Sequence, residues 1–310
     1  MKWCSSHLPI LLLLSVLSLF ISRAAGFRIC AYNVQNFNPS KANNYLVLHT
    51  LTKVVSRCDI CLLQHVVDPD STAIKTVVET LNRYDEYQYQ SVSSKSLGKS
   101  PDDMQQYVFI YRTNTVNMTG QHQYTKKNSF VREPFVVQFQ SSNTNINEFI
   151  LVPLHTDPAK AVQEIDWLYD VFEEVSTKWN NTNVMFLGDF HASCAYVTRQ
   201  DRKNIRLYTD PNFSWLIGDR EDTTVTDETN CAYDRIVVHG QSFLKEIVPF
   251  SGRVFNFGRR FKTSMKRVLE LSDHFPVEVR LKGSALHLQA TPLLSLLGVS
   301  VIVWSFLPDL

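Results

Sequence analysis

The sequence has almost no net charge, no low-complexity segment and no internal repeat. Its 31 lysine and arginine residues balance 30 aspartate and glutamate residues, which leaves a formal charge of +1. A chain without a strong overall field can bind nucleic acid only through a local basic patch. Because no linker or repeat divides the chain, we expect one domain over residues 27–282, about 255 residues once both hydrophobic ends are set aside.

The first hydrophobic segment lies at the start of the chain. Lys2 precedes an apolar run over residues 8–21, and small residues follow at 24–26. This arrangement is typical of a secretory signal peptide over residues 1–26, and the run is short for a membrane-spanning helix. We therefore expect the protein to enter the secretory pathway and to act outside the cell, at its surface or in the endoplasmic reticulum.

The second hydrophobic segment lies at the end of the chain, over residues 283–310. Gly283-Ser284-Ala285 precede a short spacer and an apolar run over residues 293–307, and no lysine or arginine follows that run. Small residues before a terminal apolar run are typical of a glycolipid-anchor signal, although this spacer is shorter and less polar than usual. We expect membrane association through a glycolipid. A spanning helix with a cytoplasmic stop fits less well, and a retained apolar tail is the third alternative.

Histidine and carboxylate side chains recur at the ends of expected strands. Val184–Leu187 is a short apolar run typical of a buried strand, Gly188 allows a bend, and Asp189 follows. The same pattern occurs at three other strands, where the polar residues are His155, Asp234, Asp273 and His274. Ligands gather at strand ends in α/β sheets, so we expect these two histidines and three carboxylates to lie together at one end of the sheets.

Apolar strand patterns alternate with helical patterns along the chain, which indicates an α/β fold. Helices are expected over residues 43–57, 71–82 and 158–179. Strands are expected over residues 27–34, 58–68, 107–111, 135–139, 149–154 and 184–187.

An ordered series of short motifs resembles the deoxyribonuclease I family over residues 27–282. The motifs are Ala31-Tyr32-Asn33, Arg132-Glu133-Pro134, Pro153-Leu154-His155, Gly188-Asp189-Phe190, Cys231-Ala232-Tyr233-Asp234-Arg235 and Ser272-Asp273-His274. The secreted branch around deoxyribonuclease gamma is the most similar. The resemblance implies a four-layer α/β/β/α sandwich of the endonuclease/exonuclease/phosphatase type. It also implies hydrolysis of double-stranded DNA with little sequence specificity, as expected when contacts go to the backbone.

The resemblance also implies catalytic roles for the residues at these strand ends. His274, oriented by Asp234 or Asp273, would take the proton of the attacking water. His155, supported by Gln105, would serve the leaving group, although the two histidines can exchange these roles.

Further roles implied by the resemblance concern ions, DNA and a disulfide. Asp189 and Asn33 would hold the phosphate region and a divalent metal, Mg²⁺ or Mn²⁺, and Asp273 would be a further metal ligand. Arg132 and Tyr196 would grip the DNA backbone, because a guanidinium suits a phosphate diester. Asp222 and Thr224 resemble a calcium-binding loop whose oxygen atoms suit Ca²⁺. Cys194 and Cys231 match the family's structural disulfide, which secretion makes plausible. The sequence indicates no protein partner.

Three positions among the expected catalytic and metal-binding residues depart from the family pattern. His65 replaces the glutamate that is the main metal ligand, Gln105 replaces a glutamate, and His191 replaces an asparagine. Mg²⁺ prefers oxygen ligands and imidazole suits softer ions, so Zn²⁺ is the alternative ion at His65. Gln105 can orient His155 but carries no charge to stabilise its imidazolium. His191 can hydrogen-bond a phosphate oxygen.

These departures leave two main hypotheses, a working nuclease with impaired use of Mg²⁺ and a DNA-binding pseudonuclease. Sphingomyelinases and phosphoinositide phosphatases of the wider superfamily are a weaker alternative, because the pattern of Cys194 and Cys231 favours the deoxyribonuclease branch. The remaining mature cysteines, Cys30, Cys58 and Cys61, lie in or beside apolar strand runs. We expect them to be buried free thiols.

Overall fold

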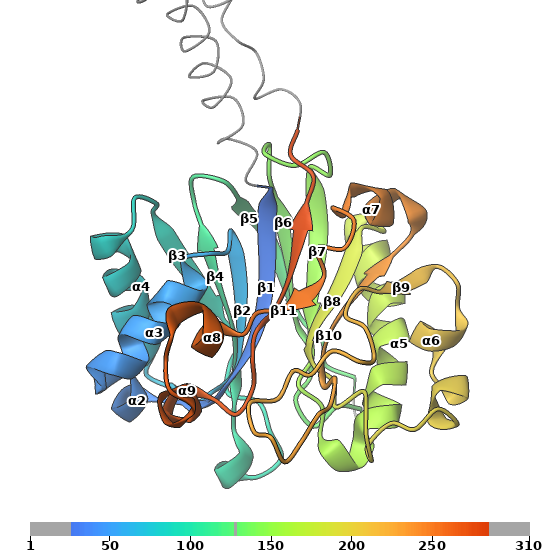
Figure 1. The fold of residues 1–310 in the computed structure, drawn as a ribbon. Coiled ribbons are helices and arrows are strands. Elements are labelled where there is room, and N and C mark those ends of the chain that lie inside the picture. Colours follow the sequence, from blue (N-terminus) through green and yellow to red (C-terminus); the bar gives the residue numbers. More distant parts are fainter. Residues whose placement is uncertain (1–25, 127–128, 285–310) are drawn as a thin grey trace, which may run out of the picture. The chain divides into compact units, whose positions relative to one another are not determined.

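A computed structural model describes residues 26–126 and 129–284. Phe27–Lys282 form one compact unit, in which two six-stranded sheets pack against each other between helices (Figure 1). The predicted α/β/β/α sandwich is confirmed. Nearly all of the expected signal peptide and nearly all of the expected tail lie outside the described residues. Within the described part, no helix has the length and apolarity needed to cross a bilayer.

The first sheet carries the amino-terminal strand in its interior. Its order is β11 (Arg253–Val254), β12 (Val277–Leu281), β1 (Phe27–Phe37), β2 (Ile60–Val66), β4 (Gln106–Arg112) and β3 (Tyr89–Ser93). Its outer face packs against α2 (Pro39–Asn43), α3 (Tyr45–Val55), α4 (Thr72–Tyr84), α8 (Phe257–Phe261) and α9 (Met265–Leu271). β1 and β2 run parallel, whereas β12 runs antiparallel to β1.

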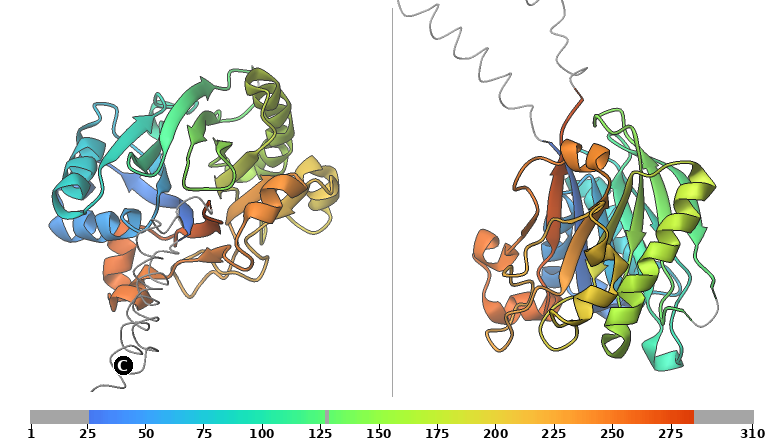
Figure 2. Two further views of the ribbon diagram at one scale, coloured as in Figure 1. Left: turned by 90° about the horizontal axis from the view of Figure 1, so that it is seen from above. Right: turned by 90° about the vertical axis from the view of Figure 1, so that its right-hand side faces the viewer.

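The second sheet carries the strand that ends at Asp189. Its order is β5 (Asn117–Gln123), β6 (Phe135–Gln140), β7 (Glu148–Pro153), β8 (Val184–Asp189), β10 (Asp234–His239) and β9 (Phe213–Trp215). Its outer face packs against α5 (Ala161–Trp179) and α6 (Arg206–Thr209). The view from above separates the helices of the two outer layers, and α7 (Gln241–Glu246) lies at one end of the space between the sheets (Figure 2).

Three hydrophobic cores follow from the alternation of side chains along the strands. In β8, Met185 and Leu187 face the other sheet, whereas Val184 and Phe186 face α5. These strands are apolar on both faces because both faces are covered, which explains why they read as continuous apolar runs. The expected helices are confirmed with shifts of a few residues at their ends. For example, α5 begins after a 3₁₀ turn over Pro158–Lys160.

Two disulfides join elements of the described chain. The Cys194–Cys231 bond is confirmed. The expectation that Cys30 and Cys58 are free thiols is wrong, because they form a second disulfide with their Cα atoms 6.1 Å apart. Cys30 lies in β1, and Cys58 immediately precedes the neighbouring strand β2. Cys61 is a buried free thiol, and burial raises its pKa to about 12.

Removal of the Cys30–Cys58 bond is expected to destabilise the fold. Cys30→Ala should lower the free energy of unfolding by about 2–5 kcal/mol, the usual loss for a native disulfide. Urea unfolding under non-reducing conditions measures this change. Cys61→Ala is the matched control, because it removes a buried sulfur of the same core without breaking a bond. Equal losses in both variants would contradict a structural role for the disulfide.

Candidate active site

The ends of strands from both sheets bring polar side chains to one place. Asn33 lies in β1, Asp189 ends β8, and Asp234 begins β10. Asp234 and Asp189 are direct partners in the antiparallel pair of β10 and β8. The Asn33 amide donates a hydrogen bond of 2.9 Å to Asp189 Oδ2, which joins the first sheet to the second. His155 follows β7 by two residues. The predicted convergence of strand ends is therefore observed for these residues.

Asp189 is the fully buried centre of this group. Three imidazoles approach its carboxylate: His191 Nδ1 at 3.4 Å, His274 Nε2 at 3.6 Å and His155 Nε2 at 3.7 Å. Burial opposes ionisation, but the three histidines and the Asn33 hydrogen bond outweigh it and hold the pKa of Asp189 well below its ordinary value. The carboxylate is therefore ionised throughout the neutral range.

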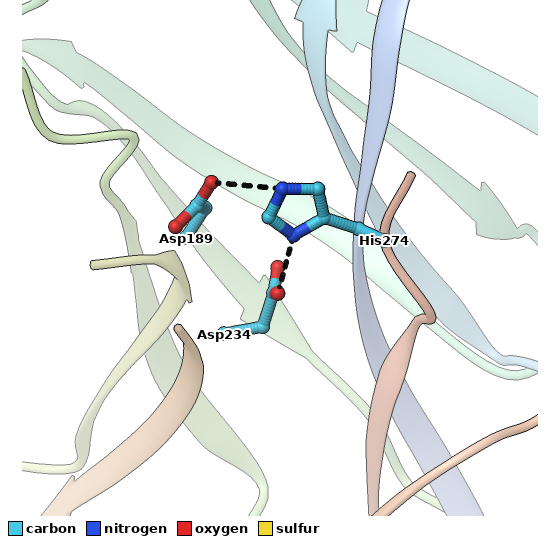
Figure 3. A group of neighbouring side chains, drawn as sticks. All are labelled: Asp189, Asp234 and His274. Carbon is cyan, nitrogen blue, oxygen red and sulfur yellow. Dashed lines mark hydrogen bonds and ion pairs between the residues drawn. The ribbon is translucent and has the colours of Figure 1, made fainter. Parts of the chain in front are cut away.

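His274 is held between two carboxylates, as Figure 3 shows. Its Nδ1 lies 2.7 Å from Asp234 Oδ2, and its Nε2 faces Asp189. Burial lowers the pKa of His274, but Asp234 and Asp189 more than compensate and raise it to about 10. Asp273 contributes less, because its nearest oxygen is 3.9 Å from His274 Nε2 and its side chain is 45% exposed. Of the two orienting acids left open by the sequence, the structure favours Asp234.

His155 lies in the opposite electrostatic environment. Its Nδ1 donates a 2.8 Å hydrogen bond to Gln105 Oε1, as the sequence led us to expect. Burial lowers the pKa of His155 well below its ordinary value, and Asp189 does not compensate. A neutral imidazole protonated at Nδ1 presents the lone pair of Nε2 toward Asp189. The site thus holds two histidines beside one carboxylate whose pKa values are shifted in opposite directions.

Three positioning residues were missed by sequence reasoning. The Gln64 amide donates to Leu154 O at 2.6 Å and accepts the Asp189 N–H at 3.0 Å, so it ties the ends of β7 and β8 together. The Tyr107 hydroxyl accepts the backbone N–H of His155. Thr156 Oγ1 lies 2.9 Å from His191 Nδ1. The one signal for Gln64 was a polar residue within an apolar strand, since such a residue needs a buried partner.

The rings of His65 and His191 both lie close to the ring of His155. The His65 ring centroid is 5.3 Å from that of His155, and the His191 ring stacks on His155 at 6.0 Å. Both residues adopt left-handed backbone conformations, with φ of 58° and 47°. Burial, aided by Arg132, lowers the pKa of His65 to about 4, so this imidazole is neutral.

Arg132 is placed differently from the expectation that it grips DNA. It is 4% exposed, and one guanidinium nitrogen contacts both Asp103 oxygens, at 2.8 and 2.9 Å. Its remaining donors bind the carbonyls of His155 and Thr156. Arg132 therefore holds the segment that carries His155. By contrast, Tyr196 is 39% exposed and its ring lies 5.0 Å from His191.

The expected calcium loop is held by internal hydrogen bonds. Asp222 Oδ1 accepts the Thr224 N–H at 3.0 Å, the Thr224 hydroxyl at 2.6 Å and the Cys231 N–H at 3.2 Å. Thr224 also forms an isolated bridge with His274. The loop is therefore coupled through its backbone to the protonated histidine.

The residues around Asp189 fit a divalent cation. Ligand atoms of Asp189, Asp234 and His274 lie within 4.8 Å of one another. Asp234 Oδ1 is buried without a hydrogen-bond partner among the described residues, and such an orphaned carboxylate oxygen suits a hard cation. This group does not contain His65, which the sequence led us to expect as a ligand.

The fold and this site define a class of phosphate-ester hydrolases: residues 30–274 match the Endonuclease/Exonuclease/phosphatase family. Within this class, the chain belongs to the deoxyribonuclease I family. It is 42% identical to human deoxyribonuclease gamma, with 89% of this chain and 91% of the relative covered. It is 40% identical to chicken deoxyribonuclease-1, with 86% and 96% covered. The human Nocturnin catalytic domain has the same fold at 11% identity, with a TM-score of 0.57 and 84% of this chain and 95% of that chain covered.

Proposed function

We propose that this chain is a metal-dependent endonuclease that hydrolyses phosphodiester bonds of double-stranded DNA with little sequence specificity. The observation that carries the proposal is the geometry around Asp189, where His155 and His274 both direct Nε2 toward one buried carboxylate, at 3.7 and 3.6 Å, and have pKa values shifted in opposite directions. Pairs of titratable groups whose environments separate their pKa values mark the acid and the base of a hydrolase. Family membership and relatives named deoxyribonucleases support the same conclusion.

The protonation states give each histidine a role. His155 Nε2 would accept the proton of the attacking water as its oxygen bonds to phosphorus. His274 would donate its Nε2 proton to the leaving oxygen as the phosphorus–oxygen bond breaks. This is the exchanged form of the roles first expected, and it follows from His274 being the histidine that starts protonated.

A divalent ion, Mg²⁺ or Mn²⁺, would be held by oxygen atoms of Asp189 and Asp234. It would neutralise charge on the phosphate in the transition state. Asn33 would fix the Asp189 carboxylate for this purpose through its 2.9 Å hydrogen bond. Ca²⁺ would be held separately by Asp222 and Thr224. Tyr196, exposed beside His191, would contact the DNA backbone.

The second candidate function is a DNA-binding pseudonuclease. It is favoured by the rings of His65 and His191, which stand where the family has an acid and an amide. Against it, the Gln105 carbonyl still accepts the Nδ1 proton of His155, so loss of the family's glutamate leaves the ring oriented. We favour the working enzyme.

The two histidines set the expected pH dependence. Activity needs neutral His155 and protonated His274, so kcat/KM should stay level across the neutral range. It should fall as pH rises toward 10, where His274 loses its proton. Asp234→Asn removes a charge that raises this pKa and should move the alkaline limb to lower pH, whatever its effect on the maximal rate. An alkaline limb near neutrality in the unchanged protein would contradict the assignment.

His65→Glu is expected to raise Mg²⁺-dependent cleavage of plasmid DNA. A carboxylate at position 65 would add a hard donor and a negative charge near the ion that Asp189 and Asp234 would hold, whereas a neutral imidazole adds neither. A softer ion suffers less from this lack, so the unchanged protein should prefer Mn²⁺ or Zn²⁺ to Mg²⁺. His191→Asn should add to the gain, although changes around one ion need not be additive. The exposed His49→Glu makes the same charge change on α3 and should have no effect. If His65→Glu and His49→Glu behave alike, His65 does not limit the use of Mg²⁺.

We also propose the secretory pathway as the route of the protein, with the mature domain at residues 27–282. The two disulfides support an oxidising compartment. Replacement of the segment after about Ser284 by a glycolipid would place the enzyme at the cell surface. The short spacer before the apolar run leaves a retained apolar tail as the alternative.

A further inference from the structure

Three asparagines carry the acceptor pattern for N-linked glycans, and none of the roles above uses them. The pattern needs serine or threonine two residues after the asparagine, with any residue except proline between them. The three matching segments are Asn117-Met118-Thr119, Asn180-Asn181-Thr182 and Asn212-Phe213-Ser214. Such short patterns also arise by chance, so the exposure and the position of each asparagine decide whether it can carry a glycan.

All three acceptor side chains are exposed, and within the described part of the chain none of them makes a side-chain hydrogen bond. Each also lies at the boundary of an element. Asn117 is the first residue of β5, Asn180 ends α5 with φ of 47°, and Asn212 lies in the turn before β9. A bulky polar group attached at any of these places would therefore displace no buried contact.

The second sheet brings the first two acceptors to one of its ends. Asn117 of β5 pairs with Gln140 of β6, which pairs in turn with Glu148, the first residue of β7. The Glu148 carbonyl accepts side-chain N–H groups from Asn181 at 3.3 Å and from Asn183 at 3.2 Å. The turn that follows α5, with the second acceptor at its start, therefore lies beside the beginning of β7.

The third acceptor lies at the same end of the sheet. His239 is the last residue of β10, and its Nδ1 lies 2.9 Å from the carbonyl oxygen of Thr182. His239 also pairs with Phe213 of β9. The backbone N–H of Gly240 donates a 2.8 Å hydrogen bond to the Asn212 carbonyl. All three acceptors thus lie along one end of the second sheet, which we call the distal end.

The distal end is opposite to the catalytic residues. β7 and β8 run parallel and both begin at the distal end, whereas Asp189 is the last residue of β8 and His155 follows β7 by two residues. Because a strand rises about 3.3 Å per residue, the six residues of β8 separate the distal end from Asp189 by about 17 Å. A glycan at the distal end is therefore attached well away from the phosphate that the site would bind.

The two edges of the second sheet also start at the distal end. β5 and β9 are its edge strands, and the unpaired backbone groups of an edge strand can pair with another chain unless they are protected. Asn117 begins β5, and Asn212 immediately precedes β9. A bulky, hydrated glycan at each of these places would hinder the approach of a second chain along the edge.

We propose that Asn117, Asn180 and Asn212 carry N-linked glycans, which cover the distal end and screen both edges of the second sheet while the catalytic end stays open. The inference goes beyond the nuclease function and rests on the proposed secretory route. The donor is an oligosaccharide linked through pyrophosphate to a lipid in the endoplasmic reticulum. The amide nitrogen bonds to the anomeric carbon as the bond from that carbon to the pyrophosphate breaks. The amide loses one proton, and the lipid pyrophosphate leaves.

Mass spectrometry of the full-length protein from cultured animal cells tests the three sites. Peptide N-glycosidase in ¹⁸O-water converts each glycosylated asparagine to labelled aspartate, and we expect the label at all three positions. Thr119→Ala, Thr182→Ala and Ser214→Ala should each remove the label from one site. Thr119→Ser, Thr182→Ser and Ser214→Thr are the matched controls, because they keep the acceptor pattern and should keep the label. Absence of the label from any of the three sites in the unchanged protein would overturn the proposal.

A glycan installed at the catalytic end tests the placement. Asp227→Asn completes an acceptor pattern with Thr229 in an exposed loop, whose Val225 N–H bonds to the carbonyl of Asp273, the neighbour of His274, at 2.8 Å. Its glycan should lower the rate of plasmid nicking severalfold. Glycosidase treatment restores aspartate at position 227 and should restore the rate. The same treatment of the unchanged protein should leave the rate unaltered, and a faster rate would contradict glycans held away from the site.

The screening of the edges has its own measurement. Thr119→Ala combined with Ser214→Ala removes the two edge glycans and should make the protein aggregate faster on concentration, by light scattering. Thr182→Ala removes the third glycan, keeps both edge glycans and should aggregate no faster than the unchanged protein. Equal aggregation of the two variants would overturn the screening role.

The secretory route and the nuclease function fail separately from the glycans. A protein that stays in the cytosol with Cys194 and Cys231 reduced would show that both the route and the glycans are wrong. Release of disulfide-bonded protein without the label would support the route and overturn the glycans. If all three sites are labelled but no DNA is nicked in Mg²⁺, Mn²⁺ or Zn²⁺, the nuclease proposal is wrong and the glycans are supported.

Discussion

Replacing His274 by Ala is expected to lower kcat/KM for DNA hydrolysis by about 10²–10⁴-fold, the usual contribution of a positioned general acid. In the proposed mechanism, the imidazolium of His274, held between Asp234 and Asp189, gives its proton to the leaving oxygen. Its loss leaves the leaving oxygen to depart unprotonated. Initial rates on a labelled oligonucleotide, with KM determined separately, measure the change.

Two further variants separate chemistry from folding. His49→Ala removes an exposed histidine from α3 and should leave the rate unchanged. His274→Gln retains a side chain of similar length that can contact Asp234 but cannot donate a proton as an acid. It should therefore stay close to His274→Ala in rate and close to the unchanged protein in unfolding midpoint. A His274→Gln enzyme with near-normal kcat would remove His274 from the proposed chemistry.

Gly188→Ala is expected to produce the largest loss of stability of any single methyl addition near the site, about 3 kcal/mol or more. Gly188 has φ of 135°, which side chains rarely adopt. A Cβ there would lie 2.2 Å from Gln64 Nε2 and 2.4 Å from Leu154 O. It would break the bridge by which Gln64 joins the ends of β7 and β8. Activity should fall with stability, because Asp189 follows directly.

Gly218→Ala provides the comparison for this prediction. Its added Cβ would meet one atom only, Glu221 Cγ at 3.8 Å, and its φ is not in the left-handed region. Urea unfolding of both variants should show a large loss for Gly188→Ala and a small change for Gly218→Ala. Similar midpoints would show that the close approach around Gly188 is not a constraint on the fold.

The sequence was sufficient to predict those site residues that lie at the ends of strands. His155 directly follows an apolar run and Asp189 follows one after a single glycine, and the carboxyl ends of the parallel strands β7 and β8 meet at one edge. Covered strands leave a strong apolar signal, so the central strands were found. The edge strand β5 was missed, because its sequence Asn117–Gln123 is mostly polar and partly exposed and so lacks the apolar signal of a covered strand.

Contacts between distant loops could not be predicted from the sequence. Arg132 has the side chain of a phosphate-binding residue, but its partner Asp103 lies 29 residues away in a different loop. The Cys30–Cys58 bond depends on the register that brings the start of β2 beside β1. The left-handed backbone of His65 interrupts β2 and places its ring beside that of His155, outside the group of metal-ligand atoms around Asp189. Each of these outcomes depends on tertiary geometry and has no local sequence signature.

Nicking of supercoiled plasmid in Mg²⁺, Mn²⁺ and Zn²⁺ tests most directly whether the site is a working phosphodiesterase. The unchanged protein should convert supercoiled DNA to the nicked form, faster in Mn²⁺ or Zn²⁺ than in Mg²⁺, and His274→Gln should do so only at a small fraction of that rate. Nicking by the unchanged protein that does not exceed that of His274→Gln in any of the three ions would contradict the account and favour the pseudonuclease.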